Sequence, residues 1–140
     1  MTDSNEEIGL EDFYKLGKIK GWEEKEEKIR KVLSEKFNTS FKRKKLLIGY
    51  KSNDTPKQHE FDLVSLDGDI IGEVKTFTPL KGGGRPSGKI DTTFQACYLL
   101  EKVIARRKLL VLTNNEFFKI FKKESDGIVS KEIEILYIPV

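Results

Sequence analysis

Cysteine and histidine are scarce in this chain, and each scarcity excludes a class of site. One cysteine, Cys97, rules out a disulfide scaffold and fits a reducing compartment. Cys97 lies in an apolar helical pattern with no base beside it, so we interpret it as a core residue rather than a nucleophile. One histidine, His59, lacks the partners that a histidine-built metal site needs.

Long apolar runs are also lacking, since no segment is long and apolar enough to span a bilayer. Residues 1–7 are acidic and polar rather than signal-like. We therefore expect a cytoplasmic protein with no membrane partner. No internal repeat or heptad is visible, and no Gly-Lys-Ser/Thr opens a helix, which disfavours nucleotide hydrolysis.

The 140 residues suffice for one domain with one core. A net charge of +3 does not by itself demand a nucleic-acid partner. We expect residues 1–20 to form an N-terminal extension, with Met1 to Glu7 disordered and a short helix ending near Gly17. Residues 21–140 are expected to form the domain.

Apolar spacing predicts an amphipathic helix over Trp22–Phe37, with Trp22 as its core anchor, and a strand over Phe41–Tyr50. The resulting order of helix, strand, hairpin, helix, strand, helix, strand predicts an α/β fold, a mixed sheet with helices on both faces. The other expected elements are a turn over Ser52–Pro56, a mobile basic loop over Thr76–Lys89, a helix over Ile90–Arg107 ending in Arg106-Arg107, a strand over Leu109–Thr113, a helix from Asn114 or Asn115 to about Lys122, and a strand over Ile133–Ile138.

The segment from His59 to Lys75 contains the most informative local signal, Asp67-Gly68 between two β-prone runs. Asp-Gly in this position predicts a two-residue type I′ hairpin. The register then pairs Val64 with Ile71. It also places Asp62 opposite Glu73 and Glu60 opposite Lys75.

Strict alternation along this hairpin puts Asp62, Glu73 and Lys75 on one face. Phe61 and Leu63 fall on the other face, the apolar core face, together with Ile70, Gly72 and Val74. His59 has the opposite parity to Asp62, so we expect it to point away from the acids.

Two acids directly opposed across a strand pair destabilise it unless a cation neutralises them. Hard oxygen ligands favour Mg²⁺, Mn²⁺ or Ca²⁺ over zinc. The alternative is a solvated polar face on which Glu60 pairs with Lys75 and the other acids contact water.

Asp62 on the second expected strand, then ten residues, then Glu73-x-Lys75 on the third resembles the PD-(D/E)XK nuclease superfamily. This restriction-endonuclease-like fold has an αβββαβ core and includes archaeal Holliday junction resolvases. The resemblance covers about Trp22 to Thr113. The proline that usually precedes the aspartate is replaced by Phe61.

The resemblance implies a nuclease that uses Mg²⁺ or Mn²⁺, held by Asp62, Glu73 and the Val74 carbonyl, with Lys75 at the attacking water. A first-helix glutamate is also implied, for which Glu26 is our choice over Glu23 and Glu27. Gln95 resembles the family's glutamine on the next helix, with Tyr98 one residue closer than in the usual spacing. The implied catalytic residues are thus Asp62, Glu73, Lys75, Glu26 and Gln95.

The implied partner is DNA, branched or duplex, and a homodimer is expected because cutting both strands needs two sites. Lys81, Arg85 and Lys89 on the glycine-rich loop are candidates for phosphate contact. The basic run 42–45 either joins that surface or protects an edge strand. Two other functions stay open, a nucleic-acid-binding module without turnover and a small structural or interaction subunit.

Overall fold

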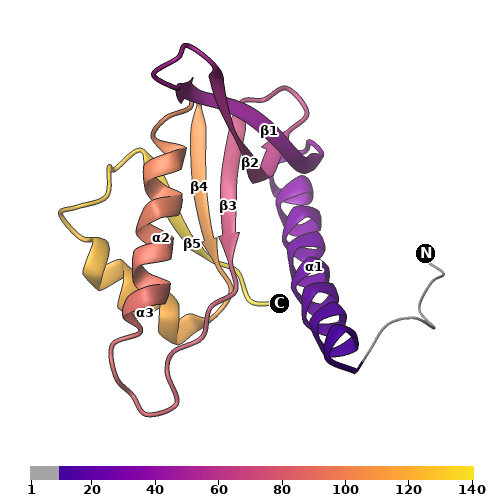
Figure 1. The fold of residues 1–140 in the computed structure, drawn as a ribbon, viewed down its shortest axis with the longest axis vertical. Coiled ribbons are helices and arrows are strands. Elements are labelled where there is room, and N and C mark those ends of the chain that lie inside the picture. Colours follow the sequence, from indigo (N-terminus) through magenta and orange to yellow (C-terminus); the bar gives the residue numbers. More distant parts are fainter. Residues whose placement is uncertain (1–9) are drawn as a thin grey trace.

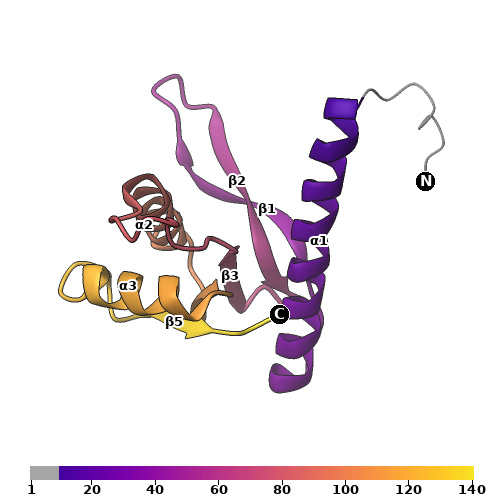
Figure 2. The same ribbon diagram turned by 90° about the horizontal axis from the view of Figure 1, so that it is seen from below.

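A five-stranded sheet lies between helices on its two faces (Figure 1, Figure 2). The computed structural model describes the backbone of residues 10–140 and the side chains of residues 21–140; the expected disorder of Met1–Glu7 lies outside the described residues. In chain order the elements are α1 (Leu10–Phe37), β1 (Phe41–Tyr50), β2 (Pro56–Ser65), β3 (Ile70–Lys75), α2 (Ser87–Leu100), β4 (Arg107–Leu112), α3 (Asn115–Ser125) and β5 (Ile133–Tyr137).

The strands lie side by side in sequence order, β1-β2-β3-β4-β5. Strands β1, β2 and β3 pair antiparallel, whereas β3, β4 and β5 pair parallel. The expected element order and mixed α/β class are therefore confirmed. None of the described helices combines the length and the apolar character needed to cross a bilayer.

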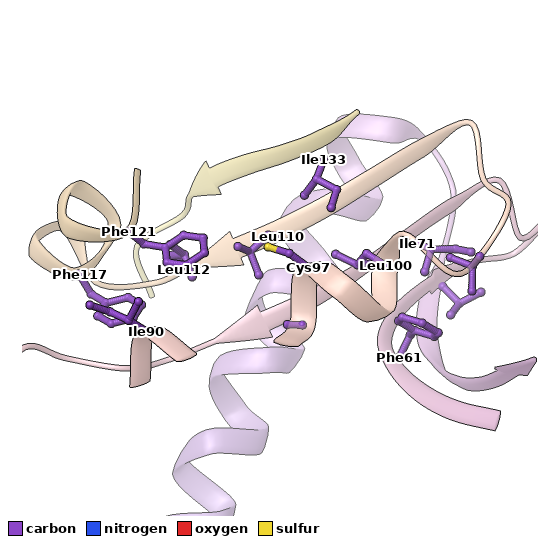
Figure 3. Close-up of a cluster of buried hydrophobic side chains, with 13 residues drawn as sticks. Phe61, Ile71, Ile90, Cys97, Leu100, Leu110, Leu112, Phe117, Phe121 and Ile133 are labelled. Carbon is purple, nitrogen blue, oxygen red and sulfur yellow. The ribbon is translucent and has the colours of Figure 1, made fainter. Parts of the chain in front are cut away.

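The sheet separates two hydrophobic clusters. Helix α1 packs on one face through Ile29 and Leu33. Helices α2 and α3 cover the other face, where Phe117 and Phe121 lie against the strands (Figure 3). Strand β4 contributes to both clusters because its residues alternate between the faces, Leu109 and Val111 toward α1, Leu110 and Leu112 toward α2 and α3.

Gly72 sets how closely β3 approaches β4. A Cβ atom built there would lie 2.8 Å from the Leu109 carbonyl oxygen and 3.0 Å from a Leu63 methyl. Only glycine leaves room for this approach of the two strands. Because Glu73 is the next residue on β3, this close packing also fixes the position of the Glu73 backbone relative to β4.

The predicted boundaries of two helices are wrong. Helix α1 runs without interruption through Gly17, since one interior glycine costs only about 1 kcal/mol. The helix therefore crosses the expected boundary between residues 20 and 21. Helix α2 begins after Pro86, earlier than expected, and ends at Leu100.

Arg106 and Arg107 do not cap a helix. Both backbone N–H groups donate to the Asp69 carbonyl, at 2.9 and 3.1 Å, which ties the start of β4 to the β2–β3 turn. The prediction for β1 is confirmed. Of the two predicted cap residues of α3, Asn114 is the cap, and its side chain accepts from Phe117 N.

The β2–β3 turn differs in type from the prediction. Gly68 has φ 75°, but the only described non-glycine residues with positive φ are Asn38 and Asp54, so Asp67 does not adopt the type I′ conformation. The Asp67 carboxylate accepts instead from Ser65 Oγ at 2.8 Å and Asp69 N at 3.0 Å, and these local bonds stabilise the observed turn between Ser65 and Ile70. The predicted pairing of Val64 with Ile71 is confirmed.

Candidate active site

A β-bulge in β2 lies at the centre of the site. Lys42 pairs with Val64 and Lys44 with Phe61, so Arg43 alone opposes two residues, Asp62 and Leu63. The bulge interrupts the alternation of side chains. Leu63 consequently packs toward α1, whereas Phe61 packs with Val64 toward α2 and α3, and the prediction that Phe61 and Leu63 share a face is wrong.

Strand β2 separates from β3 at Asp62, and there the two predicted acids meet. The last ladder pair before this point is Leu63 with Gly72. Beyond it, Asp62 Oδ2 accepts from Val74 N at 2.9 Å, and Glu73 Oε2 accepts from Asp62 N at 3.3 Å. Each carboxylate thus bonds to the backbone of the other strand, which holds the two acids together. The Val74 side chain belongs to the hydrophobic cluster that packs against α1.

Glu26 reaches the same place from α1 and is fully buried. Arg43 donates to both of its oxygens, from Nε at 3.1 Å and from Nη2 at 3.0 Å, and Arg30 donates to Oε1 at 3.3 Å. The alternatives differ: Glu23 and Glu27 are exposed. Of the three glutamates considered on α1, only Glu26 is buried beside the acid pair.

Arg43 links these groups, and the sequence did not single it out. Its Nη2 lies 3.8 Å from Asp62 Oδ1 and its Nη1 3.5 Å from Glu60. Its guanidinium stacks 4.5 Å from the ring centroid of Trp22, which is therefore a partly exposed stacking partner rather than a core anchor. The only available signal was its place in the run 42–45, and that run alone does not distinguish Arg43 from its exposed neighbours.

His59 points into the site, contrary to prediction. Its Nε2 lies 2.7 Å from Glu73 Oε1, and its ring packs edge-on against Phe61 at 4.7 Å. The bulge explains the error, because one extra residue reverses the parity of every residue before it in β2. His59 and Phe61 therefore share the face of Glu73.

Burial makes the three carboxylates hard to ionise. Desolvation, followed by the negative charge of Glu73, raises the pKa of Asp62 to about 7. Burial also raises the pKa values of Glu73 and Glu26, and it lowers the pKa of His59. A cation placed beside Asp62 and Glu73 would favour their charged forms.

Lys75 lies two residues beyond Glu73 on β3 and is partly exposed. Its positive charge lowers the pKa values of both Asp62 and Glu73, opposing the larger effect of burial. The structure therefore brings together four predicted residues, Asp62, Glu73, Lys75 and Glu26.

The remaining predicted residues lie outside this group. Gln95 is exposed on α2 and forms no hydrogen bond to Lys75 in the described part of the chain. Arg85 lies on the glycine-rich loop and donates to Glu124 at 3.0 and 3.1 Å. Lys89 lies in the first turn of α2 rather than on the loop, and it donates to the Thr78 carbonyl at 2.6 Å. The loop is thus tied to α3 and to α2, and Lys81 is the one predicted base of this region without a contact of this kind among residues 21–140.

Across residues 21–140, no group of three or more His, Cys, Asp or Glu side chains is arranged to hold a metal ion. Cys97 is buried, and burial raises the pKa of its thiol to about 12, which fits the predicted core role. No protein-family model, curated protein or solved structure matches the chain.

Proposed function

We propose that this protein is a divalent-metal-dependent DNA endonuclease of the PD-(D/E)XK type. The observation that carries the proposal is the meeting of Asp62 and Glu73 where β2 and β3 separate: Asp62 accepts from Val74 N, and Glu73 accepts from Asp62 N. Lys75, two residues beyond Glu73, completes the family's aspartate and Glu-x-Lys pattern. The element order α1-β1-β2-β3-α2-β4 agrees with the restriction-endonuclease-like core.

The donor set fits Mg²⁺ or Mn²⁺. Asp62 and Glu73 offer hard carboxylate oxygens, and their raised pKa values reflect buried negative charge that a cation would compensate. Mg²⁺ is commonly held by one or two carboxylates, with waters and substrate phosphates completing its shell, so a third protein carboxylate is not required. When bound, such an ion neutralises the scissile phosphate and lowers the pKa of an attacking water.

The chain's own residues have distinct roles in this proposal. Asp62 and Glu73 would hold the ion, while Lys75 would orient the attacking water and stabilise the charge that develops. Arg43, with a third of its side chain exposed, donates to the phosphate. Glu26 is a positioning residue that orients the Arg43 guanidinium. Among residues 21–140, Gln95 forms no hydrogen bond to the acid pair. Arg85 and Lys89 are bonded to Glu124 and Thr78, so within the same residues Lys81 is the predicted base left free to follow the DNA backbone.

A nucleic-acid-binding module without turnover is the second candidate. It is favoured because the acids already have partners within the protein. Arg43 donates to both oxygens of Glu26, and His59 lies against Glu73. Cleavage separates the two candidates, since both bind DNA and only the nuclease breaks it.

The test is cleavage of labelled single-stranded, duplex, flapped and four-way-junction DNA with Mg²⁺ or Mn²⁺. Asp62→Asn and Glu73→Gln are expected to lower the rate at least about 10³-fold, because each removes an ionic ligand with little change in shape. Asp54→Asn is the matched control: it makes the same chemical change at an exposed turn residue with φ 64°, a conformation that asparagine accepts.

Ion binding has a readout that needs no substrate. Mg²⁺ or Mn²⁺ is expected to raise the Tm of the native protein and of Asp54→Asn, and to leave the Tm of Asp62→Asn unchanged. Full cleavage by Asp62→Asn would refute the nuclease assignment. An ion-induced Tm shift without cleavage of any substrate would favour the binding module.

A further inference from the structure

A second charged region lies at the opposite edge of the sheet from β1. A cleft of about 920 Å³ opens between α3, the loop that follows it and β5. Figure 2 shows α3 and β5 running side by side at this edge. Four lysines line the cleft, namely Lys119, Lys122, Lys123 and Lys131.

These lysines are exposed, and none of them forms an ion pair with any side chain of residues 21–140. Three nearby acids are already paired with other bases. Glu124 bonds to Arg85 at 3.0 Å, Glu132 to Lys108 at 2.8 Å and Glu134 to Arg107 at 2.9 Å. Asp126 is the one acid lining the cleft, so the lysine charge there is largely uncompensated.

The floor of the cleft is apolar. Phe118, Val129 and Ile135 line it and are less exposed than the lysines. The Phe118 ring lies 5.8 Å from the ring of Tyr137, itself exposed, so an aromatic pair borders the cleft. A ligand that fits must carry several negative charges and also present flat apolar faces.

We propose that this cleft binds a single-stranded nucleic acid, with the lysines following the phosphates and the bases lying on the Phe118 side. Single strands expose base faces that stack on aromatic rings, whereas a duplex hides them. A simple polyanion would use the lysines and leave the apolar floor empty. The site is separate from the Asp62–Glu73 pair, so binding here does not depend on cleavage.

The test measures binding of a fluorescent oligothymidine of about 16 nucleotides by anisotropy, in EDTA and over a range of salt. The variant K119Q/K122Q/K123Q keeps the helical preference of α3 and removes three charges. We expect at least about tenfold weaker binding and a salt slope smaller by about 2, since each phosphate contact on a single strand contributes about 0.7.

The matched control is K25Q/K28Q/K31Q, which removes three exposed lysines from α1. It is expected to change the affinity by less than about threefold. Equal losses in the two triple variants, or native affinity in the α3 variant, would overturn the proposal.

Phe118→Leu keeps an apolar floor and removes the stacking surface. We expect it to weaken oligothymidine binding by about fivefold or more and to leave binding of inorganic polyphosphate unchanged. If the α3 lysine variant weakens both ligands and Phe118→Leu weakens neither, the cleft binds polyanions in general and the nucleic-acid assignment is wrong. Because divalent ions are absent, these results stand apart from the test of nuclease activity.

Discussion

The acid site and the lysine cleft are both clusters of like charge, but the fold treats them in opposite ways. At the acid site Glu26, Asp62 and Glu73 are buried. The structure supplies the charges of Arg43 and Arg30 to compensate them, and His59 as a hydrogen-bond partner of Glu73. At the cleft the lysines are exposed and unpaired within the described chain. Buried charges need partners inside the protein, whereas exposed charges are screened by water and salt. The acid site should therefore dominate stability, and the cleft should affect it little.

The largest effect on stability is expected from Arg43→Met, which leaves the buried carboxylate of Glu26 with Arg30 alone. Removing one partner of a buried pair typically costs about 3–5 kcal/mol; because Arg43 is partly exposed, we expect about 2–3 kcal/mol by urea unfolding. The double variant E26Q/R43M should recover much of this loss, since the unpaired charge is gone. The control Arg106→Met breaks the exposed pair with Asp69 and should cost less than about 1 kcal/mol. Equal costs at the two arginines would remove the contrast between buried and exposed charge.

The next effect concerns pH. The pKa of Asp62 is about 7 in the folded protein against an ordinary value of 3.8. The folded state thus keeps a proton that the unfolded state releases, so this group contributes stability below pH 3.8 that is lost as pH rises to about 7. The Tm of Asp62→Asn minus that of the native protein should therefore grow across this window, by about 5 °C or more, and level off above it. Thermal melts in EDTA measure this difference, and a flat difference would show that Asp62 is not strained by burial.

Gly72→Ala tests whether close packing of β3 on β4 supports the acid site. The added methyl meets the Leu109 carbonyl, which is backbone and cannot swing away, so we expect a loss of about 1–3 kcal/mol. Gly49→Ala is the control, because a Cβ there has no neighbour within 4 Å. Denaturant unfolding of both variants measures the difference, and equal stability would show that the strands separate easily.

The smallest effect is expected at the lysine cleft. The variant K119Q/K122Q/K123Q should change the free energy of unfolding by no more than about 0.5 kcal/mol, with a slight gain at low salt as like charges are removed. Urea melts at two salt concentrations check this. A large loss would mean that the lysines are structural.

Local chemistry accounts for what sequence reasoning predicted well. The Asp67-Gly68 signal located the hairpin, and counting outward from it placed Asp62 beside Glu73. Burial requirements identified β4 from its apolar run, and the Asn114 cap located α3. Each of these signals acts within a few residues, so each can be read without knowing the rest of the fold.

The missed features depend on pairing between strands. The bulge at Asp62 and Leu63 is defined by the register of β1 against β2, and nothing within β2 itself announces it. The extra residue of the bulge places the side chain of His59 next to Glu73 and that of Phe61 on the α2 face of the sheet. In the sequence, nothing separates Arg43 from the other three residues of its basic run. Its role depends on the bulge, which places it opposite Asp62.

The sequence by itself determined the order of the helices and strands, the position of the hairpin and the meeting of Asp62 with Glu73, because turn preference and side-chain period are local properties of the chain. Only the tertiary structure decided which charged residues surround that pair. It also decided that three acids near the α3 lysines pair with other bases and leave those lysines without an ion pair among the described residues. Those outcomes depend on contacts between residues far apart in the chain, where a shift of one position reverses the face on which a side chain lies.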